Sequence, residues 1–94
     1  MSLFSVSVNP GAGVSVTGTL DATGVAEVNR VVTDFLTMDG SDLDLLTLDL
    51  STVTMCDHTA VEVVRHAQAA CAKAALALRV VPSEAVRYAM HPRP

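Results

Sequence analysis

The chain has 94 residues, half of them apolar, which suffices for one hydrophobic core and leaves no room for a second. Its net charge of −4 and its scattered Lys and Arg residues argue against a nucleic-acid surface. No apolar run reaches the roughly 20 residues of a membrane-spanning helix, and the N-terminus has no secretion-signal pattern. We therefore expect a single cytoplasmic domain, 1–94, without membrane insertion or direct binding of nucleic acid.

The first half of the chain predicts a hairpin followed by a helix. Alternating apolar and polar residues predict strands from Leu3 to Val8 and from Val14 to Leu20. The turn formers from Asn9 to Gly13 join them as a β-hairpin. Asp21 ends the second strand and is placed to cap a helix. Apolar residues spaced three and four apart predict that helix from Val25 to Leu36, and Asp39 to Asp42 stop it.

The second half alternates strands and helices. An almost continuous apolar run predicts a central strand from Asp44 to Leu50, covered by helices. A second helix begins at Thr59 or Ala60, and a further apolar strand runs from Leu76 to Val81. A helix-start signal at Pro82 then introduces a short last helix that ends at Met90.

These elements follow the order β-β-α-β-α-β-α, in which strand–helix–strand units imply right-handed crossovers between parallel strands. The sequence therefore predicts an α/β fold with a mixed four-stranded sheet and packed helices. The two cysteines, Cys56 and Cys71, have no metal-like spacing and are expected to be buried thiols. We expect no metal and no cofactor.

The second helix has a predicted inner stripe and a predicted outer face. Its inner stripe consists of Val61, Val64, Ala67, Cys71 and Ala74 or Ala75, and its outer face of Glu62, Arg65, His66, Gln68 and Lys73. Glu62 falls three residues after Thr59, which matches the Thr-x-x-Glu capping box. A capping role is by itself a sufficient structural reason for a threonine at position 59.

Two carboxylates follow strand ends, Asp21 after the hairpin and Asp57 before Thr59. Functional groups of open α/β sheets gather outside the carboxyl ends of the strands. Converging carboxylates there would hold Mg²⁺ with the phosphates of a nucleotide, or orient the Thr59 hydroxyl toward a phosphoryl donor. Asp49 lies within the central strand and is interpreted as a satisfied or edge-facing carboxylate.

Enzyme chemistry has little support in the sequence. Paired acids could serve a hydrolase, but capping aspartates at strand and helix ends are common. Ser/Cys–His–acid catalysis would need a positioned base, and His58 is a turn neighbour of Asp57 and Thr59, so the three side chains are not expected to meet at one target. His66 and His91 are predicted to be solvated. The glycines of the hairpin turn precede a strand and not a helix, so they do not make a phosphate-binding loop. We therefore expect no enzyme activity.

Three motifs in order give the chain a resemblance to a known family. They are Gly18-Thr19-Leu20-Asp21, Asp49-Leu50-Ser51 and Asp57-His58-Thr59-Ala60. The chain resembles the STAS domains of bacterial anti-sigma factor antagonists, which have a Gly-x-Leu-Asp before the first helix, an Asp-Leu-Ser strand and an Asp-Ser-Ser-Gly corner. The spacing of the motifs matches over nearly the whole chain.

This resemblance implies a phosphorylation-controlled regulator of transcription. In that family an anti-sigma factor that is also a serine/threonine kinase phosphorylates the second Ser or Thr of the corner, and a phosphatase resets the switch. The resemblance therefore implies Thr59 as the phosphorylated residue, and a partner-binding site that comprises Asp21, Asp57, His58, Thr59, Ala60 and Glu62. The unphosphorylated form would bind the kinase and release the sigma factor.

The corner departs from the family pattern at two residues. His58 stands where a serine is usual, and Ala60 stands where the family prefers glycine. A second hypothesis therefore stays open, in which the chain resembles the small STAS accessory subunits of bacterial lipid-transport ABC systems. Its partner would then be an ABC ATPase, and Thr59 would be a contact residue without phosphorylation.

Overall fold

The computed structural model describes residues 4–9, 11–39 and 43–90, and the predicted fold class and element order are confirmed there. The strands are β1 (Phe4–Asn9), β2 (Gly13–Leu20), β3 (Leu45–Cys56) and β4 (Ala77–Pro82), and the helices are α1 (Ala22–Asp39), α2 (Ala60–Lys73) and α3 (Glu84–Met90). Leu3, most of the predicted helix stop (Gly40 to Asp42) and His91 lie outside the described residues.

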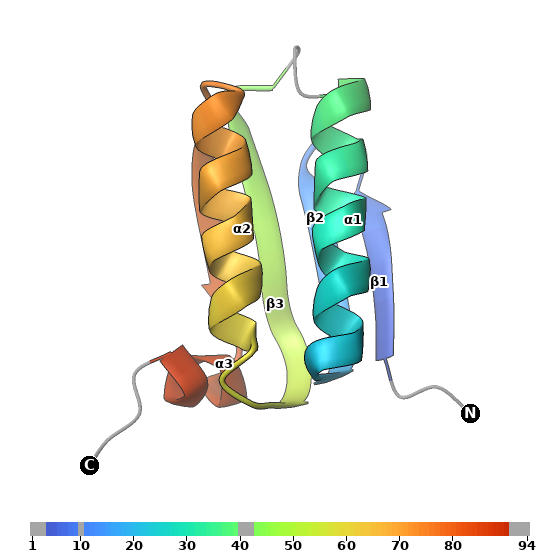
Figure 1. Ribbon diagram of the computed structural model, residues 1–94, viewed down its shortest axis with the longest axis vertical. Helices are drawn as coiled ribbons and strands as arrows, with labels where there is room; N and C mark the ends of the chain where they lie inside the picture. Colours follow the sequence, from blue (N-terminus) through green and yellow to red (C-terminus); the bar gives the residue numbers. More distant parts are fainter. Residues whose placement is uncertain (1–3, 10, 40–42, 91–94) are drawn as a thin grey trace.

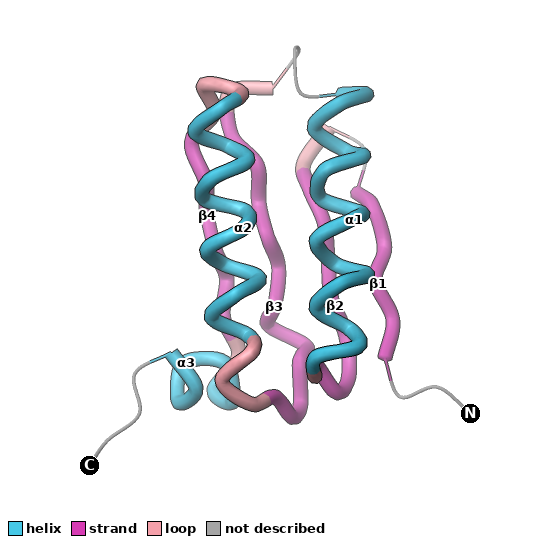
Figure 2. Tube along the Cα trace, in the orientation of Figure 1, coloured by secondary structure: helices cyan, strands magenta, loops and turns pink. Residues whose placement is uncertain are grey.

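The four strands form one mixed sheet in the order β1-β2-β3-β4. β1 pairs antiparallel with β2, whereas β2–β3 and β3–β4 are parallel. Helices α1 and α2 lie side by side over one face of the sheet, and α3 lies at the end where β3 and β4 terminate (Figure 1, Figure 2). The described part of the chain contains no helix that is long and apolar enough to cross a membrane.

The core lies between the sheet and the two long helices. It is built almost entirely from aliphatic side chains, as the scarcity of aromatic residues requires. The buried apolar residues are Val14, Val16, Leu20, Val25, Val28, Val32, Phe35, Leu46, Leu48, Leu50, Val53, Ala60, Val63, Val64, Ala67, Cys71 and Val86.

The hairpin turn requires a glycine at one position, and the first parallel pair of strands requires another. Gly11 has a φ of 76° in the turn that the amide of Ala12 closes on the carbonyl of Asn9 at 3.0 Å. Gly13 lies against β3 so closely that a Cβ there would stand 1.9 Å from the carbonyl oxygen of Thr47. The close approach of β2 to β3 therefore depends on the missing side chain of Gly13.

Two predicted boundaries and one predicted stripe need correction. α1 begins at Ala22, earlier than predicted, and β3 continues to Cys56, beyond the predicted end at Leu50. In α2 the buried residues are Ala60, Val63, Val64, Ala67 and Cys71. The predicted inner positions Val61, Ala74 and Ala75 are half-buried or exposed. The last two fail because α2 ends at Lys73 and Ala75 turns the chain with a φ of 59°.

Replacing Gly13 by alanine is expected to destabilise the fold by about 3 kcal/mol or more, because the new methyl group would force β2 and β3 apart. Gly11→Ala is the matched control, since a Cβ there meets no atom within 4 Å and only its positive φ opposes the change. That variant should lose about 1–2 kcal/mol. Urea unfolding of both variants measures the difference, and equal losses would contradict the close-approach argument.

Candidate functional site

Strands β2 and β3 both end at the side of the sheet where α1 and α2 begin (Figure 1). Leu20 and Cys56, the last residues of β2 and β3, lie opposite each other in the parallel pair. Asp21 and Asp57 follow them directly, so both carboxylates lie at the same edge. They line one hollow of about 220 Å³, which we call the strand-end hollow, lined by Thr19, Leu20, Asp21, Met55, Cys56 and Asp57.

Asp57 holds Thr59 through its carboxylate. The Oδ1 atom of Asp57 accepts hydrogen bonds from the backbone amide of Thr59, at 2.9 Å, and from the Thr59 hydroxyl. The hydroxyl bond, followed by the amide bond, lowers the pKa of Asp57 below its ordinary value, because both bonds stabilise the charged form. The Asp57 carboxylate is exposed to solvent. The site therefore holds an ionised acid with a hydroxyl aimed at it.

The predicted capping box at Thr59 is wrong. Thr59 already has helical backbone angles (φ −66°, ψ −16°), and its side chain makes no capping hydrogen bond. The carbonyls of Asp57, His58 and Thr59 accept the amides three residues further along, which starts the helical turn before α2 proper. Asp57 performs the capping in its place. Consequently the Thr59 hydroxyl is not needed to satisfy the amides at the start of α2.

Asp21 caps the start of α1, as its position in the sequence predicted. Its Oδ1 atom accepts the amides of Thr23 at 3.1 Å and Gly24 at 3.2 Å. This cap explains why α1 begins at Ala22. Both carboxylates of the strand-end hollow are therefore engaged by the amides of a helix start, and both remain on the surface.

The other predicted partner-binding residues occupy different environments. His58 and Glu62 are both exposed; His58 directly follows Asp57 in the chain, and Glu62 lies in the first turn of α2. Ala60, by contrast, is fully buried in the core, so its side chain is not part of the exposed surface. No group of three or more His, Cys, Asp or Glu side chains with the geometry of a metal site occurs among the described residues.

Sequence reasoning missed Met55, which is 66% exposed although it lies in an apolar strand. The register of β3 against β2 shifts at two places, between Ser15 and Thr17 and between Gly18 and Thr19. The second shift turns Met55 outward at the rim of the strand-end hollow. Its neighbour Cys56 is half-buried and not buried as predicted, and burial raises the pKa of its thiol.

The Asp-Leu-Ser motif has a local structural role. Asp49 accepts the amide of Ser51 at 2.9 Å and its hydroxyl at 2.6 Å, and these bonds lower the pKa of Asp49. Thr52 donates its hydroxyl to the carbonyl of Val16 at 2.9 Å. These side chains supply hydrogen bonds at the first register shift of β3, which confirms Asp49 as a satisfied carboxylate.

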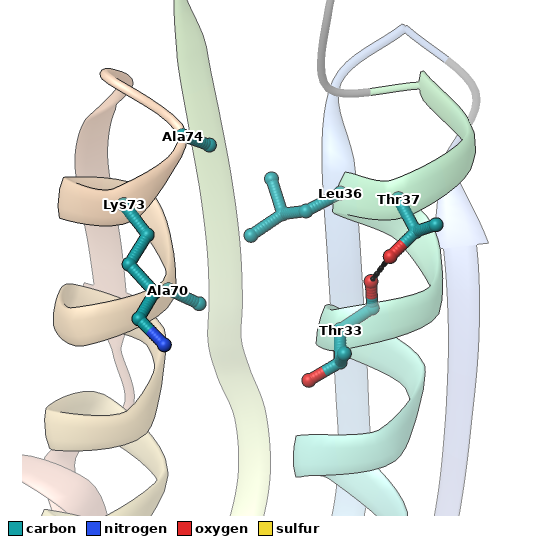
Figure 3. Close-up of a pocket in the computed structure, with 6 residues that line it drawn as sticks. All are labelled: Thr33, Leu36, Thr37, Ala70, Lys73 and Ala74. Atoms are coloured by element: carbon teal, nitrogen blue, oxygen red, sulfur yellow. Dashed lines mark hydrogen bonds between the residues drawn. The ribbon is translucent and has the colours of Figure 1, made fainter.

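A second hollow lies between the outer surfaces of α1 and α2 (Figure 3). It has a volume of about 260 Å³ and is lined by Thr33, Leu36, Thr37, Ala70, Lys73 and Ala74. His66, which the sequence predicts to be solvated, lies beside this hollow. It is half-buried, and its Nε2 atom lies 3.0 Å from the Thr33 hydroxyl, where it joins the two helices. This hollow offers no paired acid and base.

Comparison of the chain with models of known protein families gives no match, and comparison with curated proteins gives no significant relative.

Replacing Thr59 by valine should raise the pKa of Asp57, because it removes the hydroxyl bond that is the largest cause of the lowered value. Thr59→Ser should leave the pKa low. The hydrogen bond from the Thr59 hydroxyl to Asp57 stabilises the fold at pH values above the ordinary aspartate pKa of about 3.9. This stabilisation is lost as the pH falls through the lowered pKa of Asp57. NMR titration of the carboxyl groups measures the pKa, with Asp49 as the internal control. An unchanged Asp57 pKa in the valine variant would contradict the assignment.

Removing the cap at Asp21 should cost more stability than removing the Thr59 hydroxyl, because the Asp21 carboxylate satisfies two amides at a helix start and the Thr59 hydroxyl satisfies none. Asp21→Ala is expected to lose about 0.5–2 kcal/mol. Asp21→Asn keeps an accepting oxygen and should lose much less. Chemical unfolding of these variants beside Thr59→Ala gives the comparison, and a larger loss for Thr59→Ala would show that threonine is the cap after all.

Proposed function

We propose that the chain is a STAS-like binding module of the bacterial cytoplasm, an anti-sigma factor antagonist, and not an enzyme. Its partner is an anti-sigma factor with serine/threonine kinase activity, which phosphorylates Thr59, and a phosphatase removes the phosphate. The observation that carries the proposal is the Thr59 hydroxyl, half-buried at the start of α2 and hydrogen-bonded to the exposed carboxylate of Asp57.

The position of the hydroxyl suits phosphoryl transfer from ATP. The Thr59 oxygen would attack the γ-phosphorus, the bond from phosphorus to the ADP oxygen would break, and the hydroxyl proton would leave to a base. A general base works best with a pKa near the ambient pH, and the lowered pKa of Asp57 makes it a weak one. Asp57 therefore orients the hydroxyl, and the kinase supplies the base.

Phosphorylation would change the charge of the corner without altering the core. A phosphate on Thr59 adds roughly −1.5 to −2 charges. It also removes the hydroxyl proton, so Thr59 can no longer donate its hydrogen bond to Asp57. The Asp57 carboxylate would then repel the phosphate, whereas the N-terminal end of α2 would attract it. A partner docked on this corner would meet a bulkier and more acidic surface, which explains release on phosphorylation.

The docking surface in this proposal combines an apolar side chain with an acidic rim. Met55 is exposed at the strand-end hollow, and Asp21 and Asp57 border the same hollow. His58 and Glu62 extend the surface along the start of α2. Such a surface fits a partner that presents an apolar side chain surrounded by basic groups.

The proposal predicts a mass increase of one phosphate when the chain is incubated with ATP and an anti-sigma factor kinase encoded by a neighbouring gene. Thr59→Ala should abolish the increase, and Thr59→Ser should keep it. Thr54→Ala is a matched control on the exposed surface of β3 and should be phosphorylated normally. Intact-mass spectrometry reports each result. A phosphate that survives Thr59→Ala would overturn Thr59 as the acceptor.

Partner capture separates this proposal from the accessory-subunit hypothesis. Immobilised wild-type chain should retain the kinase, and Thr59→Asp should lose it while its urea unfolding stays unchanged. Recovery of the ATPase of a lipid-transport ABC system in place of the kinase would contradict the antagonist function.

A further inference from the structure

The free edges of the sheet are unequally protected. β4 forms one outer edge, where it carries the exposed Arg79 and ends at Pro82. A charge and a proline both discourage pairing with a further strand. β4 pairs with β3 only as far as Leu50, and α3 packs against β3 near the end where β4 stops (Figure 2). These features disfavour the addition of a strand at that edge.

β1 forms the opposite edge, and the strand itself, Phe4–Asn9, contains no charged residue and no proline. From Ser5 to Asn9 it alternates hydroxyl or amide side chains with valines. It pairs with β2 along one side, and no other strand within the described residues pairs with its outer side. Its register against β2 is regular throughout, without a bulge to twist the edge away. β1 is therefore an available template for strand pairing.

An apolar hollow continues from this edge onto α1. It has a volume of about 210 Å³ and is lined by Val8, Val31, Asp34, Phe35 and Met38. Val8 is 45% exposed and Met38 is 81% exposed, so both offer apolar area that association would bury. The one charged residue of the hollow, Asp34, already lies 3.3 Å from the guanidinium of Arg30. Like-charge repulsion at this surface is therefore weak.

We propose that two copies of the chain associate through β1, pairing antiparallel about a two-fold axis to form one continuous sheet. A two-fold contact requires a self-complementary surface, and an uncharged strand that alternates apolar and polar residues meets that requirement. The pleat restricts the register, because the valines of both copies must stay on the helix-covered face. Val6 then lies opposite either Val6 or Val8 of the second copy.

The size of this contact predicts its strength. One pair of short edge strands buries a small area, and the apolar surface of Val8 and Met38 adds to it. We therefore expect a dimer that dissociates on dilution and not an obligate one. The docking surface for the proposed kinase lies at the ends of β2 and β3, away from this edge, so dimer formation does not depend on the proposed function.

Sedimentation analysis across a dilution series tests the proposal, with twice the 9.8 kDa mass of one chain expected at the higher concentrations. Ser7→Lys should give the monomer, because Ser7 is exposed on β1 and pairing would bring the two lysines within reach of each other. Ala77→Lys adds the same charge at an exposed position of β4 and should leave the dimer intact.

Met38→Lys provides a second variant, at a position so exposed that folding should not be affected, and it should weaken the dimer as well. Circular dichroism confirms that each variant is folded. A wild-type chain that is monomeric at every concentration would overturn the proposal. A dimer that survives both Ser7→Lys and Met38→Lys would also overturn it, because the contact would then lie elsewhere.

Discussion

The parallel pairing of β2 with β3 is the constraint on which the rest of the molecule depends. At one end it requires the bare backbone of Gly13 against Thr47, and at the other it sets Leu20 opposite Cys56. Because the strands are parallel and end together, the residues that follow them, Asp21 and Asp57, reach the same edge of the sheet. Each then starts a helix with its own carboxylate. The same pairing thus builds the core and creates the surface corner.

The irregular course of β3 makes that corner different from a simple strand end. A strand that alternated strictly after Leu50 would turn Val53 away from the helices, yet Val53 is only 2% exposed. The first register shift restores Val53 to the core, and the second turns Met55 outward. At the first shift Asp49 accepts hydrogen bonds from the amide and hydroxyl of Ser51, and the Thr52 hydroxyl donates to the carbonyl of Val16. β3 therefore contributes side chains to the core along most of its length, whereas near its end Met55 is exposed at the surface.

The sequence was informative where one physical rule dominated and misleading where two rules competed. Hydrophobic periodicity predicted every strand and helix of the described residues and their order, and the strand-end positions of Asp21 and Asp57 predicted that both follow strands at the functional edge of the sheet. The Thr-x-x-Glu pattern failed at Thr59 because an aspartate two residues earlier competes for the same helix start and wins. The exposure of Met55 depends on a register shift that apolar residues cannot reveal, since its cause lies in the pairing with β2.

Because Asp57 and not Thr59 caps α2, the Thr59 hydroxyl can be modified without loss of a helix-capping hydrogen bond. If Thr59 were the cap, any group attached to its oxygen would remove a bond that the helix needs, at a cost of about 1 kcal/mol. Asp57 satisfies the Thr59 amide itself, and the helical turn begins with backbone bonds from Asp57, His58 and Thr59. The Thr59 hydroxyl contributes only its bond to a solvent-exposed carboxylate. A change at that oxygen therefore acts on the charge and shape of the surface, while the helix start keeps the hydrogen bonds that hold it.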